Sequence, residues 1–205
     1  MKALDEGKIP WTLAVNVIAT LPMTDHRSFL IYLLENNIRD VNEARKARSR
    51  FLNNTIYTIG YEGRTVDQFI QVLKENKIET VIDVRFSVES QYKPEFSGTL
   101  LPRELLRAGI QYAHRKEFGV PYEWQNPYKD GAIPFDCLNK FYRWNVTKNT
   151  EFKTFINTVK ENGKTALLCY ERYAAPTRDQ KIACHRSILS AMMQETGEFK
   201  EVVNL

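Results

Sequence analysis

Long apolar runs are missing from this 205-residue sequence, and no stretch approaches the roughly 20 apolar residues that a membrane-spanning helix needs. The first ten residues, MKALDEGKIP, include acidic side chains and lack the apolar core of a signal peptide. Only three cysteines are present, an odd and small number that argues against a disulfide scaffold and for a reducing compartment. These absences predict a cytoplasmic protein with no membrane partner.

Common nucleotide-binding and hydrolase motifs are also absent. The chain has neither a P-loop nor a G-x-G-x-x-G fingerprint, which disfavours nucleoside triphosphates and dinucleotides in their usual binding modes. It has no G-x-S-x-G elbow for a serine hydrolase. The formal net charge is only +4, which permits a polyanionic partner without requiring one. A nucleic-acid function must therefore be argued from local clusters of charge.

Two parts are expected along the chain, a helical segment over residues 1–54 and an α/β domain over residues 55–205. The stretch RSRFLNNTIYT marks the joint, because asparagines follow a basic helix end and precede a β-branched run. In the second part, buried strands alternate with amphipathic helices. Strands are predicted at 55–59, 80–84, 110–114, 165–170 and 201–205, and helices at 66–73, 102–109, 136–145, 150–159 and 185–196.

Strands separated by helices predict parallel pairing with crossover connections. The strands read as continuous apolar runs, which suits a sheet covered on both faces. Thr65 and Gln68 fit a capping box at the start of the first of these helices. The predicted fold is therefore α/β, a mostly parallel sheet with helices on both faces, preceded by a small all-helical segment.

Ligands of such sheets bind beyond the carboxyl ends of the strands. We expect the polar residues that follow each strand to gather at this rim, together with those that open the last crossover helix. The residues expected there are Tyr61, Glu62, Asp83, Arg85, His114, Cys169, Glu171, Cys184, His185 and Arg186.

Four of these residues are candidates for catalysis. Asp83 or Glu171 would transfer a proton, His185 would assist, and Cys184 would be a nucleophile. A thiol at a helix N-terminus beside a histidine ionises more easily. If the helix began at Asp179 instead, Cys184 would lie more than one turn inside it and this argument would weaken. The alternatives are an Asp83–Arg85 ion pair that only orders a strand end, a packed Cys184 and a solvated Glu171.

The other rim residues are candidates for substrate binding. Arg85 and Arg186 would hold an anion in a fork geometry that lysine lacks, and Tyr61, Glu62, His114 and Cys169 would complete the pocket. The predicted function is an enzyme that acts on a phosphate-bearing substrate, either a nucleotide or a nucleic acid. A duller alternative is that the rim charges pair among themselves and leave no pocket.

A metal site is not predicted. Cys169, Cys184, His185 and His114 are the types of residue that bind zinc. The spacing argues against it, because no Cys-x2-Cys pair exists and the adjacent Cys184 and His185 are not expected to ligate together. No cofactor is expected either.

A non-catalytic nucleic-acid-binding module is the alternative function. The segment ARKARSR contains Arg45, Lys46, Arg48 and Arg50, which would contact phosphates or form a solvated helix face. The exposed aromatic residues of VPYEWQNPY would stack on bases: Tyr122, Trp124 and Tyr128. Because the stretch is aromatic and rich in proline, it equally suits a loop over the pocket. The oligomeric state is left open.

The second part of the chain resembles the family named domain of unknown function 488, over about residues 56–205. The resemblance is carried by a T-I-G turn, the D-V-R strand, YAH at 112–114, C-Y-E at 169–171 and C-H-R at 184–186. It implies a compact α/β domain and no settled activity. One departure is EFGVP at 117–121, where many members carry Leu-Gly-Gly, which would alter access to the pocket.

The N-terminal part is similar to the helical segment that follows the helix-turn-helix of ParB-type partition proteins. The similarity covers about 45 residues, with like positions at Ile9–Pro10, Ala14, Leu21–Pro22 and Ile38–Val41. It implies contact with DNA or with partners bound to DNA.

Overall fold

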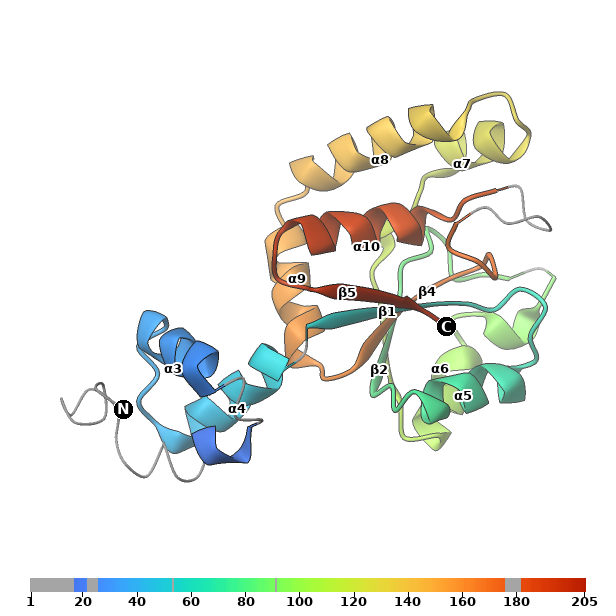
Figure 1. The fold of residues 1–205 in the computed structure, drawn as a ribbon. Coiled ribbons are helices and arrows are strands. Elements are labelled where there is room, and N and C mark those ends of the chain that lie inside the picture. The colour runs from blue at the N-terminus through green and yellow to red at the C-terminus, as the bar shows by residue number, and fades with distance from the viewer. Residues whose placement is uncertain (1–16, 22–25, 53, 91, 176–181) are drawn as a thin grey trace. The chain divides into compact units, whose positions relative to one another are not determined.

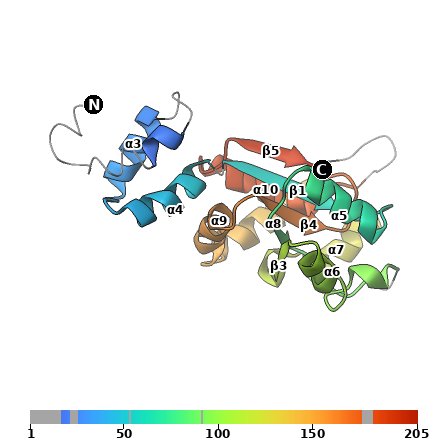
Figure 2. The same ribbon diagram turned by 90° about the horizontal axis from the view of Figure 1, so that it is seen from below.

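The computed structural model describes residues 17–21, 26–52, 54–90, 92–175 and 182–205 (Figures 1 and 2). The chain divides into two compact units, residues 1–54 and 55–205. No helix within the described ranges combines the length and the apolarity needed to cross a bilayer.

The described residues of the N-terminal unit are mostly helical, as predicted. Phe29 and Leu33 of one helix pack on Ala44 and Ala47 of the next, where the small alanine side chains let the helices come close. The carboxylate of Asp40 accepts hydrogen bonds from the first backbone N–H groups of the second helix and caps it. The elements are η1 (Ile18–Thr20), α3 (His26–Glu35) and α4 (Val41–Leu52).

The second unit contains one five-stranded sheet with the order β3-β2-β4-β1-β5. Every strand pair is parallel, so the predicted α/β fold with a parallel sheet is confirmed. The central strands β1 and β4 are buried along most of their length, in line with their apolar sequences. The strands are β1 (Thr55–Gly60), β2 (Thr80–Asp83), β3 (Gln111–His114), β4 (Thr165–Cys169) and β5 (Glu201–Asn204).

Helices cover both faces of the sheet, again as predicted (Figure 1). The chain leaves β1 and β2 toward one edge of the sheet and leaves β3 and β4 back toward the other. Because crossovers are right-handed, this reversal places the two sets of helices on opposite faces. One face carries α5 (Val66–Glu75) and α6 (Leu101–Arg107), and the other carries α8 (Phe135–Lys148), α9 (Phe152–Glu161) and α10 (His185–Glu195).

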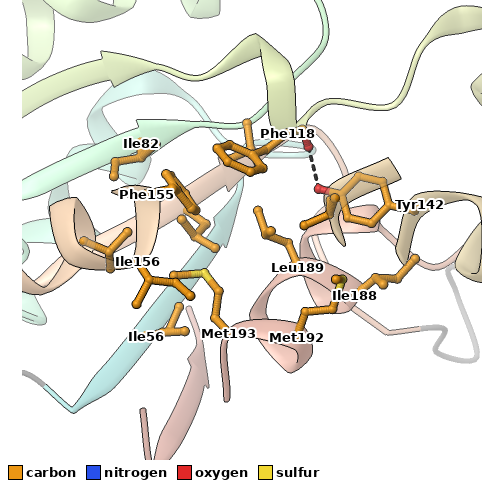
Figure 3. Close-up of a cluster of buried hydrophobic side chains, with 14 of the residues drawn as sticks. Ile56, Ile82, Phe118, Tyr142, Phe155, Ile156, Ile188, Leu189, Met192 and Met193 are labelled. Atoms are coloured by element: carbon orange, nitrogen blue, oxygen red, sulfur yellow. Dashed lines mark hydrogen bonds between the residues drawn. The ribbon is translucent and has the colours of Figure 1, made fainter. Parts of the chain in front are cut away.

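The larger core lies between the sheet and the helices α8, α9 and α10 (Figure 3). Phe155 packs against Phe118, with ring centroids 4.2 Å apart. Tyr142 is fully buried in this apolar layer, and its hydroxyl donates a hydrogen bond to the carbonyl of Phe118. This bond satisfies the one polar group that the tyrosine brings into the core.

Two predicted helix starts have their local causes in the structure. The side chain of Thr65 accepts from the backbone of Gln68, and the Gln68 side chain accepts from the backbone of Thr65, so the predicted capping box is present. Helix α10 begins at His185 with Cys184 as its N-cap residue. The alternative start at Asp179, which itself lies outside the described residues, is therefore wrong.

The stretch VPYEWQNPY is a helix, α7 (Tyr122–Lys129), and the predicted loop is wrong. Trp124 is not exposed for stacking on bases, because its ring stacks on Phe141 with centroids 3.9 Å apart. Tyr128 is also partly buried, and its hydroxyl accepts a hydrogen bond from the backbone N–H of Ala183. Of the three aromatic residues predicted to be exposed, Tyr122 alone is.

Candidate active site

A cleft of about 530 Å³ opens at the carboxyl end of the sheet, where the strand order reverses. Gly60 of β1 pairs with Cys169 of β4, and Asp83 of β2 pairs with Leu168, so the strand ends lie level with one another. Segments from five parts of the domain line the cleft. They contribute Tyr61, Arg85, Ser87, Glu89, Ser90, Tyr92, Tyr122, Gln125, Asn126, Lys129, Cys169, Tyr170 and His185.

Cys169 and His185 are paired within this cleft. Cys169 ends the central strand β4, and its Sγ lies 3.6 Å from Nδ1 of His185, the first residue of α10. Nε2 of the same ring lies 2.9 Å from the carbonyl oxygen of Val84. A carbonyl can only accept, so Nε2 carries a proton. In the neutral ring Nδ1 is then the free base, and it faces the thiol.

Glu171 and Cys184 lie beside this pair. The Cys169 thiol donates to Oε2 of Glu171 at 3.4 Å. Burial raises the pKa of Glu171 to about 7, and the neighbouring Cys184 adds to the rise. Burial and Cys169 raise the pKa of Cys184 to about 12. Cys184 does sit at a helix N-terminus, but desolvation outweighs the helix dipole there.

Both thiols are almost fully buried, with Cys169 2 % and Cys184 1 % exposed, but Cys169 lines the cleft and the predicted nucleophile Cys184 does not. The adjacent Cys184 and His185 were not expected to ligate a metal together, yet the structure brings their donor atoms close to each other. The Sγ atoms of both cysteines and a ring nitrogen of His185 all lie within 4.8 Å of one another. Between Cys184 and His185 the backbone changes from extended to helical, so the strand rule of opposite faces does not apply.

Asp83 forms a buried ion pair with Arg85 and is not free to act as an acid or base. Its two oxygens accept from the Arg85 guanidinium, from the Arg85 backbone N–H and from the Tyr112 hydroxyl. Asp83 is fully buried and does not line the cleft. Burial by itself would lower the pKa of Arg85, but the bonds to Asp83 raise it. The predicted catalytic role of Asp83 is corrected to a positioning role.

Replacing Asp83 with asparagine is expected to lower the free energy of unfolding by about 3 kcal/mol, because a buried guanidinium loses its counter-ion. Chemical denaturation followed by circular dichroism measures this change. The matched control is Glu104→Gln, which breaks the exposed ion pair between Glu104 and Arg107. We expect the control to change stability by less than about 0.5 kcal/mol, and equal effects of the two variants would contradict the structural role of Asp83.

Arg85 lines the cleft, as predicted, while most of its donors are engaged. Nη1 donates to the hydroxyl of Tyr61 at 2.9 Å and Nη2 donates to the carbonyl of Phe96 at 3.0 Å. Tyr61 also lines the cleft, and its ring stacks on Phe96. Arg85 therefore fixes the wall of the cleft and orients the Tyr61 hydroxyl.

Arg186 does not reach the cleft. Its side chain is fully buried, and its guanidinium donates to the carbonyls of Glu171 and Arg172 and to Oγ1 of Thr58. The predicted anion-binding role is corrected, because this guanidinium is committed to the segment that follows β4. Gly60 allows the same segment to approach β1 closely, because a Cβ at this position would lie 1.8 Å from the carbonyl oxygen of Glu171.

Glu62 and His114 lie near the rim but line none of the cleft. Oε2 of Glu62 accepts from the backbone N–H of Arg172 at 3.0 Å and holds the segment after β4. Nε2 of His114 donates to the carbonyl of Arg85 at 2.8 Å. Their predicted contact with substrate is corrected to the support of neighbouring loops.

Helix α7 supplies the residues that the sequence reasoning missed. Tyr122, Gln125, Asn126 and Lys129 all line the cleft, at the spacing i, i+3, i+4 and i+7 of one helix face. This polar periodicity was the available signal, and Pro127 obscured it. Nζ of Lys129 lies 3.8 Å from Oε1 of Glu171, so the helix brings a cation to the reactive group.

The basic residues of the N-terminal unit lie on α4. Arg45 and Lys46 are exposed, Arg48 is half-buried, and the side chain of Arg50 lies outside the described residues. Arg45 and Lys46 form no ion pair with the part of the chain that the structure describes.

Comparison with known proteins returned one result. Neither the curated proteins nor the solved structures gave a match. Because no match covers residues before 65, the resemblance of the N-terminal segment to partition proteins stays a prediction. A family model described as a domain of unknown function, DUF488, matches residues 65–193, and the chain belongs to this family.

Proposed function

We propose that the α/β domain is a thiol-dependent enzyme that acts on a phosphate-bearing substrate, a nucleotide or a nucleic-acid strand, in the rim cleft. Cys169 is the nucleophile and His185 is its base. One observation carries the proposal, the 3.6 Å approach of the Cys169 thiol to a histidine nitrogen whose tautomer leaves it free to accept a proton. A nucleophile paired with a base that a third group orients is the arrangement of covalent catalysis.

The proposed reaction is a substitution at the substrate and needs no oxidant. Nδ1 of His185 takes the proton of the Cys169 thiol, and the sulfur attacks an electrophilic centre of the substrate. The new bond to sulfur forms as the bond to the leaving group breaks, and His185 returns the proton to that group. Water then cleaves the covalent intermediate and restores the thiol. Lys129, beside Glu171, offsets the negative charge near the sulfur.

The substrate class follows from the walls of the cleft. Tyr122 and Tyr170 line it and offer aromatic surface for a flat base. The Lys129 side chain is 38 % exposed and its ammonium lies over the ring of Tyr170, so it is available to a phosphate. A base and a phosphate held together describe a nucleotide, free or within a strand.

Alkylation by iodoacetamide tests the assignment of the nucleophile. In reduced, chelator-treated protein we expect peptide mapping to find Cys169 modified, and His185→Gln to slow this modification by about tenfold or more. The exposed Cys137 is the internal control, whose rate should not change in the variant. Labelling confined to Cys137, or labelling of Cys169 at the same rate in both proteins, would rule out the pair.

The same assay identifies ligands of the cleft. Each of the common nucleoside monophosphates and short single-stranded oligonucleotides is added before the reagent. A ligand of the cleft should slow labelling at Cys169 and leave Cys137 unaffected. Compounds that protect Cys169 are then tested for turnover, and protection by uncharged nucleosides alone would remove the phosphate from the proposal.

A second candidate function is nucleic-acid binding through α4, which the exposed Arg45 and Lys46 favour, since neither forms an ion pair with another described residue. Two phosphate contacts release about two counterions from duplex DNA.

Substitution of Arg45 and Lys46 together by alanine is therefore expected to reduce the slope of log Kobs against log salt concentration by about 2. Fluorescence anisotropy with a random-sequence duplex measures the slope between low and moderate salt. Lys140→Ala is the control, because this exposed lysine pairs with Asp136 on a helix of the other unit. If the wild-type chain does not bind the duplex even at low salt, this second candidate is dismissed.

A further inference from the structure

We propose that Cys169, Cys184 and His185 bind one Zn²⁺ ion, with Glu171 as the fourth ligand. Three donor atoms, two Sγ and one ring nitrogen, lie within 4.8 Å of one another. In a tetrahedral zinc site, with bonds of about 2.0–2.3 Å, neighbouring donors lie roughly 3.5 Å apart. The 3.6 Å between Cys169 Sγ and His185 Nδ1 already meets this spacing.

The surroundings of His185 support the site independently. A metal-binding histidine typically donates its other ring N–H to a carbonyl or carboxylate, which fixes the ring and the tautomer. Nε2 of His185 makes this contact with the carbonyl of Val84 at 2.9 Å. Nδ1 is thereby left with its lone pair directed at the two thiols.

Glu171 completes the ligand set. Its side chain is 7 % exposed, and its Oε2 lies 3.4 Å from the sulfur of Cys169. Two thiolates neutralise a divalent ion, and Lys129, 3.8 Å from the other carboxylate oxygen, balances Glu171. Thiolates and an imidazole select a zinc-like ion over Mg²⁺ or Ca²⁺, which prefer oxygen ligands.

The ion would occupy the thiolate that the proposed function uses as a nucleophile. Metal binding requires no substrate and does not depend on the proposed function. The effect of the metal on Cys169 as a nucleophile does rest on the proposed function. In the metal-bound protein the Cys169 thiolate would be a ligand and could not attack a substrate. Release of the ion would make the thiolate available again. Cys184, which the proposed catalytic step does not use, thereby has a role.

Titration of the reduced, tag-free chain with Co²⁺ and Zn²⁺ tests the site. We expect one ion per chain, a thiolate-to-cobalt charge-transfer band that Zn²⁺ abolishes, and release of about two protons per ion from the thiols. Cys184→Ser should weaken Zn²⁺ binding by about 100-fold or more and Glu171→Gln by about tenfold, while Cys137→Ser should leave it unchanged. Circular dichroism confirms that each variant is folded.

Two results would overturn the site, and both are read from proteins that fold. One is a wild-type chain that takes up no Co²⁺ or shows no thiolate band. The other is a folded Cys184→Ser variant with wild-type affinity. Alkylation of Cys169 in the presence of chelator reports on the proposed enzyme separately. If the wild-type chain binds no metal but its Cys169 is alkylated in a His185-dependent way, the metal site alone is rejected. If it binds metal but alkylation of Cys169 does not depend on His185, the enzyme alone is rejected.

Discussion

Serine in place of Cys169 is expected to lower turnover of any substrate found for the rim cleft by about 1,000-fold or more. A serine hydroxyl at this position keeps its proton at neutral pH, and the neighbouring His185 alone gives it little nucleophilicity compared with a thiolate. The substitution is nearly isosteric, and the hydroxyl can still donate to Glu171, so the fold should be retained. Steady-state kinetics on a substrate selected by its protection of Cys169 provides the measurement.

Cys137→Ser is the matched control for this prediction. Cys137 is exposed on α8 and takes no part in the cleft. Its replacement should leave both kcat and KM unchanged. A Cys169→Ser enzyme with more than about a tenth of the wild-type kcat would show that the sulfur forms no covalent bond in the reaction, and the cleft would then be assigned to binding or to acid–base catalysis.

The fold was predictable because its signals are local. Apolar runs of strand length, the Thr65 capping box and the helical spacing after it each depend on a few neighbouring residues. Parallel pairing follows from the alternation of strands and helices. The gathering of Cys169, His185 and Arg85 at one edge then follows from parallel pairing alone, whatever the order of the strands.

The direction of each side chain at that edge was not predictable, because it depends on partners far away in sequence. Arg186 turns inward and donates to two carbonyls after β4, and the oxygens of Asp83 accept hydrogen bonds from Arg85 and Tyr112. The sequence shows that these residues are near the rim. It does not show which of them faces the cleft and which holds a loop.

The prediction of a loop where helix α7 lies was wrong for a different reason. Two prolines in one short stretch indicate a loop, yet Pro121 lies at the N-cap position, where its missing N–H costs nothing. Pro127 removes a single hydrogen bond from a helix whose partly buried Trp124 and Tyr128 pack against the core. Tertiary packing outweighs that loss, and Lys129 was overlooked as a result.

Methionine in place of Arg186 is expected to lower the free energy of unfolding by about 3–5 kcal/mol, which is the largest loss of stability anticipated for this chain. Arg186 is among the largest fully buried side chains. Methionine fills much of its volume but donates no hydrogen bond, so the carbonyls of Glu171 and Arg172 and the hydroxyl of Thr58 each lose a donor. Urea denaturation monitored by circular dichroism measures the change.

Two further variants separate the hydrogen bonds of Arg186 from its charge. Arg107→Met removes an equal charge from an exposed position and should change stability by less than about 0.5 kcal/mol. Arg186→Lys keeps the charge but lacks the planar fork that reaches two carbonyls at once, so it should recover less than half of the loss. Full recovery by lysine would mean that charge alone matters at this position. In that case Arg186 would again be a candidate for binding an anion, and a sulfate titration of wild-type stability would detect it.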